Sequence, residues 1–188
     1  MPSGYFIQPI LFLVEVLFGL YMGIVALRII MQWAKWDYQN PMVQLIIKAT
    51  QVPVKFLRRF IPSLGKWDTA TIVLLVLLAL IKTILISTIS GYVLSPFILM
   101  QLTIAGIFTL FITLFSASII IRVILSWIQP ANTYNPITPL INKMTSPLLQ
   151  PIRRMLPDLG GLDLSSLIAL LGLQLLSMLV LPLLTAQF

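Results

Sequence analysis

The sequence predicts an all-α integral membrane protein in which four transmembrane helices form two tandem, parallel-repeat helical hairpins. Each hairpin is expected to carry short interfacial amphipathic helices on the cytoplasmic side. Three observations predict this fold: the composition, four long apolar runs and an internal repeat. Of the 188 residues, 59% are hydrophobic and only 9% are charged, whereas soluble domains carry roughly 25% charged residues. The chain therefore lacks the polar side chains that would cover a soluble fold.

Four apolar runs are each long enough to cross a bilayer, which takes about 20 residues. They span residues 5–27, 69–94, 97–121 and 164–187. The first run could instead be the core of a signal peptide. However, residues 1–10 contain no Lys or Arg, and the run exceeds the usual length of such a core. We therefore expect all four runs to remain as membrane spans.

The net charge of +7 arises mainly between the spans. One basic group lies between the first two spans and another between the last two: Lys35, Lys48, Lys55, Arg58, Arg59 and Lys66, then Lys143, Arg153 and Arg154. Loops rich in Lys and Arg stay in the cytoplasm, so we expect a multi-pass plasma-membrane protein with both termini on the non-cytoplasmic side. All four Trp lie near these basic ends, as interfacial anchors do. The distribution favours anionic lipid headgroups over direct contact with nucleic acid.

An internal repeat divides the chain into two units, residues 1–94 and 95–188. The motif Arg-Ile-Ile-Met-Gln-Trp at 28–33 recurs as Arg-Val-Ile-Leu-Ser-Trp at 122–127, and residues 40–68 match residues 135–163 at 12 of 29 positions. Each unit contains two spans, so both copies have the same orientation in the membrane. This pattern predicts a parallel repeat.

Residues between the spans predict an amphipathic helix in each unit. Asn40–Pro41 and Asn135–Pro136 each fit a helix cap followed by proline at the first helical position. In the first unit Lys48, Lys55 and Arg59 then share one helical face beside an apolar arc. This pattern is typical of a helix in the headgroup region, with its basic edge toward anionic lipid.

Prolines and acidic residues predict how these segments continue. Pro53 in the first unit, and Pro147 and Pro151 in the second, are expected to divide each segment into two short interfacial pieces. Asp68 and Asp163 precede the returning spans. We expect them to cap those spans, because a helix start favours a negative charge.

Arginines mark the basic ends of both units. Arg28 and Arg122 lie late in the first and third spans, where they complement a helix C-terminus and can extend to the interface. The element Arg-Arg-x-x-Pro-x-x-Gly-x-x-Asp occurs at 58–68 and 153–163. It can be read as topogenic charge with helix caps, or as a site for lipid phosphate or an acidic partner. The candidate lipid- or partner-binding residues are Arg58, Arg59, Arg153, Arg154, Lys48 and Lys143.

Glu15 and Lys82 are the charges expected well inside the hydrocarbon. They should lie at similar depth, and a charge in lipid is costly unless paired. An intramembrane charge pair, Glu15 with Lys82, is therefore the first hypothesis, and an ion or proton relay is the second. The equivalent positions in the second unit, Thr109 and Ser177, are uncharged. Nearby, a GxxxG motif in the first span favours close helix packing within the monomer, with a homo-oligomer as the alternative.

Enzymatic chemistry has little support in the sequence. The chain contains no Cys and no His, which removes thiol chemistry and the usual transition-metal ligands. Its five acidic residues form no recognisable metal cluster, and neither a nucleophile–base pattern nor a phosphate-binding Gly-rich loop is present. We expect a protein that is not an enzyme, with no catalytic residue, no cofactor and no metal site.

The repeated unit resembles the YggT family of small bacterial membrane proteins, which includes the YlmG-type proteins of Gram-positive bacteria, cyanobacteria and plastids. The resemblance covers nearly the whole chain, which looks like the two-unit form of the family. It is carried by residues 28–33, 40–41, 50, 58–59, 62, 65 and 68, and by residues 122–127, 135–136, 145, 153–154, 157, 160 and 163. It implies the bacterial inner membrane as the location.

The resemblance implies little about activity, because the family has no established enzymatic reaction or agreed ligand. Its members are associated with tolerance of osmotic or ionic stress, with cell division and nucleoid distribution, and with cofactor assembly of a photosynthetic cytochrome complex. We expect a membrane assembly or interaction factor that acts through its basic cytoplasmic face on partner proteins or anionic lipid. The alternative is a small channel or transporter in ion or osmotic homeostasis, suggested by Glu15, Lys82 and the parallel repeat.

Overall fold

Four long apolar helices and two amphipathic helices make up the described part of the chain. The computed structural model describes residues 7–62, 67–128, 135–155 and 164–185. Its helices are α1 (Ile7–Trp33), α2 (Pro41–Leu57), α3 (Thr69–Ile89), α4 (Pro96–Ile128), α5 (Ile137–Met155) and α6 (Leu164–Thr185). Of these, α1, α3, α4 and α6 are long and apolar enough to cross a membrane. The four predicted spans are confirmed, and α1 and α4 continue beyond their apolar runs.

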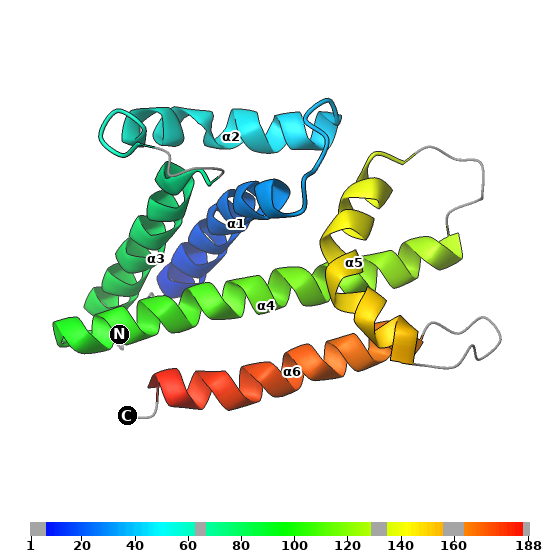
Figure 1. Ribbon diagram of the computed structural model, residues 1–188. Coiled ribbons are helices and arrows are strands. Elements are labelled where there is room, and N and C mark those ends of the chain that lie inside the picture. Colours follow the sequence, from blue (N-terminus) through cyan, green and yellow to red (C-terminus); the bar gives the residue numbers. More distant parts are fainter. Residues whose placement is uncertain (1–6, 63–66, 129–134, 156–163, 186–188) are drawn as a thin grey trace.

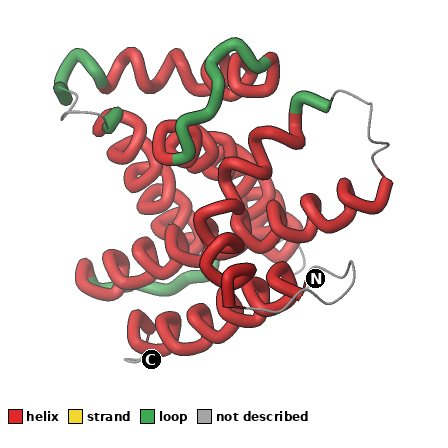
Figure 2. Tube along the Cα trace, turned by 45° about the vertical axis from the view of Figure 1, so that its right-hand side comes forward, coloured by secondary structure: helices red, strands yellow, loops and turns green. Residues whose placement is uncertain are grey.

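Each unit is a helical hairpin with an amphipathic helix at one end. In the first unit α1 packs against α3, and in the second α4 packs against α6. Figure 1 shows α1 and α4 running in one general direction, with α3 and α6 returning. The two hairpins cross at an angle, and contacts of α4 with α3 and α1 join them (Figures 1 and 2). We call the end of the spans at α2 and α5 the basic end, and the end at the α3–α4 turn the opposite end.

The amphipathic helices are continuous, so the prediction of two short pieces in each unit was wrong. The helix α2 runs through Pro53, and α5 runs through Pro147 and Pro151. Proline has no N–H, so the carbonyl of Ala49, four residues before Pro53, has no helical donor. The hydroxyl of Tyr21 on α1 lies 3.5 Å from that carbonyl oxygen and donates to it. Tertiary contact thus supplies a donor where the proline removes one.

The predicted start of α2 at Pro41 is confirmed, whereas α5 begins at Ile137, one residue after the predicted Pro136. The side-chain oxygen of Asn40 accepts from the backbone N–H of Met42 at 2.9 Å, and that of Asn135 accepts from Ile137 at 2.9 Å. The amide of Asn40 also donates to the carbonyl of Pro136 at 2.7 Å. The cap of the first amphipathic helix therefore contacts the start of the second.

Apolar side chains from both units pack together beside this contact. Ile30, Trp36 and Val43 of the first unit form one buried cluster with Leu140 and Met144 of α5. Trp36 is only 6% exposed, so its predicted role as an interfacial anchor was wrong. The indole fills the contact between the two units, so its ring faces protein side chains.

The GxxxG motif does not bring helices together within the chain. A Cβ atom added to Gly19 or Gly23 would meet no other atom within 4 Å. The expected close packing at these glycines within the monomer is therefore wrong for the described structure.

Candidate functional site

A buried ionic network centres on Asp68, which immediately precedes α3. Arg58, just beyond α2, donates through Nε to Asp68 Oδ1 at 3.2 Å and through Nη2 to Oδ2. This is a bidentate pair, the strongest arrangement of guanidinium and carboxylate. Arg28 of α1 approaches the same carboxylate, with Nη2 3.5 Å from Oδ2. One carboxylate therefore ties the end of α2 and the basic end of α1 to the start of α3.

Further hydrogen bonds hold this carboxylate in place. The hydroxyl of Thr71, one turn into α3, donates to Asp68 Oδ2 at 2.8 Å. The backbone N–H of Asp68 donates to Oε1 of Gln32 on α1 at 3.1 Å. Asp68 has the predicted position before α3, but its side chain makes no hydrogen bond to the backbone of the helix start. The predicted capping role was wrong in this respect, because the arginines and Thr71 occupy the carboxylate.

Arg28 is buried in the network and does not extend to the interface as predicted. Its side chain is 5% exposed, and Nη1 donates to Oγ1 of Thr50 on α2 at 2.7 Å. Thr50 is fully buried, and its hydroxyl in turn donates to the carbonyl of Ile46 at 2.7 Å. A buried charge is tolerated only when it is paired and hydrogen-bonded. Arg28 has both kinds of partner: the carboxylate of Asp68, just before α3, and the hydroxyl of Thr50 on α2.

The ionisation of Asp68 follows from these contacts. Burial alone would raise the pKa of the Asp68 carboxyl, but hydrogen bonds from Arg58 and Thr71 and the charges of Arg58 and Arg28 outweigh it and lower the pKa. The hydrogen bond with Asp68 raises the pKa of Arg58. The carboxylate is therefore ionised at neutral pH, and the network carries one negative and two positive charges.

The second unit repeats the arginine–threonine part of this network. Arg122 of α4 donates through Nη1 to Oγ1 of Thr145 on α5 at 2.7 Å, and Thr145 is fully buried. Arg153 donates through Nε to the hydroxyl of Ser165, at the start of α6, at 3.2 Å. Asp163, predicted to cap α6, lies outside the described residues. The repeat therefore preserves contacts as well as sequence.

Neither Thr50 nor Thr145 is assigned a role from the sequence, although the repeat contains a signal for both. Thr50 and Thr145 are identical in the two copies, and Thr50 lies on the side of its helix opposite the basic residues. A repeated polar residue on the inward side of an amphipathic helix indicates a buried partner. Gln32 had no such signal, because the equivalent residue is Ser126.

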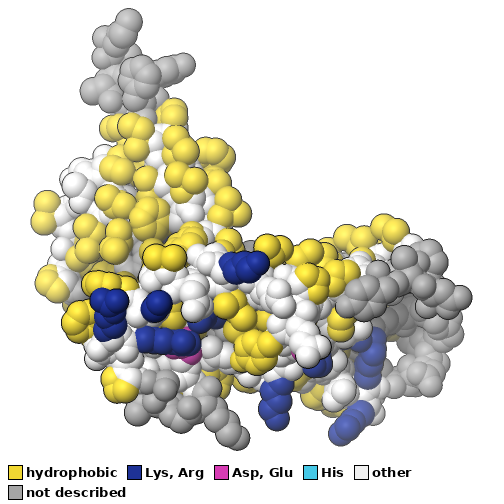
Figure 3. Space-filling view, turned by 90° about the horizontal axis from the view of Figure 1, so that it is seen from above, with side chains coloured by type: hydrophobic (Ala, Val, Ile, Leu, Met, Phe, Trp, Pro, Cys, Tyr) yellow, Lys and Arg dark blue, Asp and Glu magenta, His cyan; other side chains and the backbone are white. Residues whose placement is uncertain are grey.

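The other side of α2 carries a surface that is both basic and apolar. We call it the α2 surface: Lys48, Lys55, Leu45, Val52 and Phe56 on α2, with Arg59 and Phe60 in the turn that follows the helix. The four apolar side chains are 58–80% exposed. Figure 3 shows Lys and Arg side chains spread along one side of the molecule among hydrophobic ones. The three basic residues of the α2 surface form no ion pair with any other described residue.

The six candidate lipid- or partner-binding residues fall into two groups. Arg58 is bound by Asp68, Arg153 by Ser165, and the ammonium of Lys143 donates to the backbone carbonyl of Lys35 at 3.0 Å. These three side chains are exposed, but each has a partner within the chain. The remaining candidates are also exposed: Lys48, Arg59 and Arg154.

The charges predicted inside the membrane do not meet. Glu15 is exposed on α1, whereas Lys82 on α3 is half-buried and lines a cavity. No ion pair joins the two in the described structure, where the ion pairs are those of Asp68 with Arg28 and Arg58. The predicted intramembrane pair is thus not formed.

Comparison with known proteins finds the same family in each of the two units. The sequence profile of one family, CCB3/YggT, matches residues 7–89 and again residues 101–184. Each match covers one hairpin with its amphipathic helix. The chain belongs to the CCB3/YggT family. It is the two-unit form, as its internal repeat predicted, and no solved structure matches it significantly.

Bacterial members of the family align over most of the chain, and a further relative aligns over part of it. A Pseudomonas aeruginosa protein is 43% identical over 179 residues, which cover 94% of this chain and 90% of that protein. YggT of Escherichia coli K12 is 35% identical over 170 residues, covering 89% and 86%. A ycf19 protein of Galdieria sulphuraria is 35% identical over 71 residues, 38% of this chain and 72% of that protein. The chain is a multi-pass membrane protein with bacterial homologues.

Proposed function

We propose that this protein is a non-enzymatic assembly or interaction factor of the bacterial inner membrane. It acts through the α2 surface at its basic end, on anionic lipid headgroups and, through them, on partner membrane proteins. The observation that carries the proposal is that three basic residues without an ion pair among the described residues, and four exposed apolar residues, lie on the outward side of α2 and in the turn that directly follows it. A helix with this combination binds at a lipid headgroup boundary, its apolar groups inserted and its basic groups on phosphate.

The Asp68 network supports this role by fixing α2 on the bundle. Arg28 and Thr50 hold the inward side of α2, and Arg58 with Asp68 holds its C-terminal end. Because the helix is already ordered, docking its surface costs less conformational entropy than ordering a free helix. The two ion pairs of Asp68 thus hold α2 in position, and the basic residues of the α2 surface are left for binding.

The charge of the basic end supports a cytoplasmic location for it. Lys and Arg are concentrated in the segments that contain α2 and α5, and such segments stay on the cytoplasmic side. Both termini then lie on the non-cytoplasmic side. The cytoplasmic leaflet is rich in anionic lipid, and each basic residue near such a surface contributes about 1 kcal/mol to attraction.

A labelled variant tests whether the α2 surface meets anionic lipid. The chain contains no Cys, so Phe56→Cys provides one attachment point for an environment-sensitive fluorophore. In liposomes containing phosphatidylglycerol the probe should report an apolar surrounding, and in pure phosphatidylcholine a more aqueous one. Adding Lys48→Gln, Lys55→Gln and Arg59→Gln should abolish the difference, since three charges contribute about 3 kcal/mol.

The matched control is the same label at Leu179→Cys on α6, a side chain that is 68% exposed in a membrane span. That probe should report an apolar surrounding in both lipids and should not respond to the triple neutralisation. A Phe56 probe that is equally aqueous in both lipids would overturn lipid docking of α2.

A second arm tests contact with partner proteins. A photo-reactive phenylalanine analogue at position 56 should form adducts with membrane proteins in bacterial cells, and the triple neutralisation should remove them. The analogue at position 179 controls for random encounters in the bilayer. Adducts that are the same from both positions would contradict a specific role of the α2 surface.

A further inference from the structure

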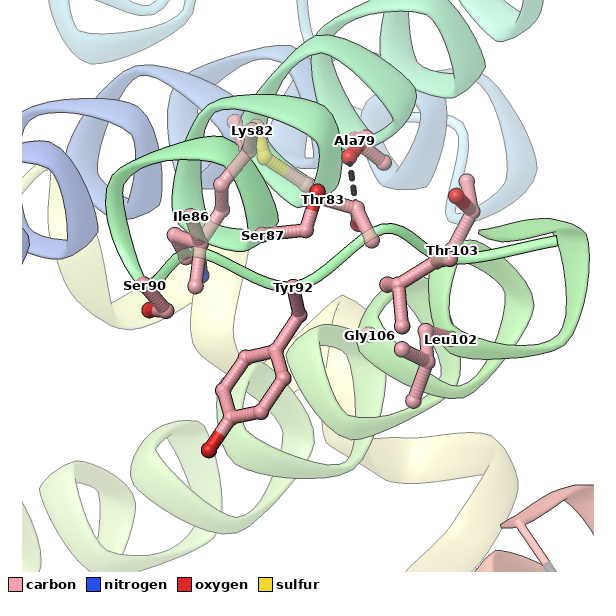
Figure 4. Close-up of a pocket in the computed structure, with 12 residues that line it drawn as sticks. Ala79, Lys82, Thr83, Ile86, Ser87, Ser90, Tyr92, Leu102, Thr103 and Gly106 are labelled. Carbon is pink, nitrogen blue, oxygen red and sulfur yellow. Dashed lines mark hydrogen bonds between the residues drawn. The ribbon is translucent and has the colours of Figure 1, made fainter. Parts of the chain in front are cut away.

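A cavity of about 470 Å³ opens between α1, α3 and α4 at the opposite end of the molecule from α2. Its walls include Met22 of α1, Ala79 and Lys82 of α3, Tyr92 of the α3–α4 turn and Gly106 of α4. Figure 4 shows these helices and the turn around it. The volume is in the range of about 300–1,000 Å³ that holds small ligands.

Lys82 is the charged residue among those that line this cavity. In Figure 4 its side chain extends past Ile86 toward Ser90. No carboxylate pairs with it in the described structure, since the ion pairs there involve Asp68. An ammonium within a membrane span is costly without a counter-charge. The cavity therefore favours a ligand that brings a negative charge.

Three of the five hydroxyl groups that line the cavity already donate within their own helices. Those of Thr83, Ser87 and Thr103 donate to backbone carbonyls of their own helices, at 2.9, 2.9 and 2.6 Å. A hydroxyl has a single proton to donate, so these groups can only accept from a ligand. The ammonium of Lys82 and the hydroxyls of Ser90 and Tyr92 are then left to donate to an anionic group, and Lys82 alone among them is positively charged.

The polar and apolar groups that line the cavity lie at different depths in the membrane. Lys82 precedes the end of α3 at Ile89 by about 10 Å of helix, at 1.5 Å per residue, and its side chain extends toward that end. The charge can therefore reach the headgroup region while the stem stays in hydrocarbon. The apolar walls formed by Met22, Ala79 and Gly106 lie on the side away from the turn. A ligand that fits has an anionic head and an apolar body.

We propose that this cavity binds one anionic phospholipid from the leaflet opposite to α2 and α5. The lipid phosphate contacts the ammonium of Lys82 near Ser90, and an acyl chain lies against Ala79 and Gly106. This site is separate from the α2 surface, so it can be present or absent whatever the function of that surface.

Filling the cavity provides the test. A Cβ atom added to Gly106 would meet no atom within 4 Å, so Gly106→Leu should place its side chain in the cavity without displacing the backbone. Gly172 on α6 has equally open surroundings and does not line the cavity. Gly172→Leu is thus a matched control of the same chemistry.

The measurement uses full-length protein in mixed micelles with a photo-reactive phosphatidylglycerol, and maps lipid adducts to peptides by mass spectrometry. Adducts should appear on the peptides that contain Ala79–Gly106, and Gly106→Leu and Lys82→Gln should each lower their yield about tenfold. Lys82→Arg should retain the adducts, as should Gly172→Leu. Photo-reactive phosphatidylcholine, which has no net charge, should label these peptides weakly.

Four outcomes would overturn the proposal. Equal labelling in Gly106→Leu and Gly172→Leu would show that lipid does not enter the cavity, and unchanged labelling in Lys82→Gln would show that its charge is not recognised. Equal labelling by the two lipids would exclude a requirement for an anion. Displacement of the label by inorganic phosphate would identify a small-anion site instead of a lipid site.

Discussion

Asp68→Asn removes a carboxylate that two arginines share while keeping the size of the side chain. The Arg28 and Asp68 side chains are 5% and 6% exposed, and removing one partner of such a buried pair costs about 3–5 kcal/mol. The contact with Arg58 adds little, because that side chain is 49% exposed and exposed pairs contribute about 0–1 kcal/mol. Arg28 keeps its hydrogen bond to Thr50. We therefore expect the free energy of unfolding to fall by about 3 kcal/mol.

Thermal unfolding in detergent, followed by Trp fluorescence, measures this loss. For a chain of this size about 3 kcal/mol corresponds to a decrease of about 10 °C in Tm. Asp37→Asn is the matched control, because Asp37 is exposed and forms no ion pair with a described residue. If Asp68→Asn and Asp37→Asn lower Tm by the same amount, the stabilising role of the network is refuted.

A double-mutant cycle with Arg28→Met isolates the buried pair. The double variant Arg28→Met/Asp68→Asn should be more stable than Asp68→Asn alone, because no buried charge is left without a partner. Strict additivity of the two single changes would contradict direct coupling between Arg28 and Asp68.

The pH dependence supplies an independent check on the same carboxylate. The pKa of Asp68 is lowered in the folded protein, so its contribution is complete above the pKa of the unfolded chain and is lost as pH falls through the lower folded value. The difference in Tm between the wild-type protein and Asp68→Asn should be constant near neutral pH. It should shrink below about pH 4. A difference that stays constant into strong acid would contradict this ionisation.

Three further changes test other parts of the structure by the same thermal measurement. Thr145→Val removes the fully buried hydroxyl that accepts from Arg122 at 2.7 Å and should cost about 1–3 kcal/mol. An unchanged Tm would contradict the repeated contact. Asn40→Ala removes both a helix cap and the 2.7 Å hydrogen bond to Pro136, and should cost about 2 kcal/mol; a loss no larger than that of Asn135→Ala would show that the contact between units adds nothing. Pro53→Ala restores a helical N–H in α2, so stability should be unchanged or rise; a clear loss would show that this proline stabilises the helix.

The sequence predicts the spans and caps well because their signals are local. Each span is an uninterrupted apolar run, and each amphipathic helix starts at an Asn-Pro pair that is present in both copies. Asn40 and Asn135 cap their helices as expected. Local composition and repetition are sufficient for these elements.

The errors occur where tertiary contacts decide the outcome. Pro53 does not break α2, and the hydroxyl of Tyr21 lies 3.5 Å from the carbonyl that the proline leaves free. Trp36 is buried because α5 packs over it. The residues next to Pro53 and Trp36 in the sequence do not indicate these contacts. Local sequence therefore predicts that the helix breaks at Pro53 and that the Trp36 ring lies at the membrane interface.

The candidate site was predicted in part. The repeated arginines and Asp68 were identified from the repeat, but their mutual pairing was not. Pairing depends on how α1, α2 and α3 approach one another, and both arginines could equally have faced lipid. The proposed contact between Glu15 and Lys82 failed for the same reason, since similar depth does not place two side chains on facing surfaces.

The central claim is that the protein acts through the α2 surface and does not conduct ions through the membrane. Ion flux tests this claim most directly. Purified protein in liposomes is assayed for potassium, sodium and proton movement beside protein-free liposomes. If the protein is an interaction factor, the flux should be the same in liposomes with and without it. Flux that requires the protein, and that Glu15→Gln and Lys82→Met abolish while Lys48→Gln leaves it unchanged, would contradict the account and identify a channel or transporter.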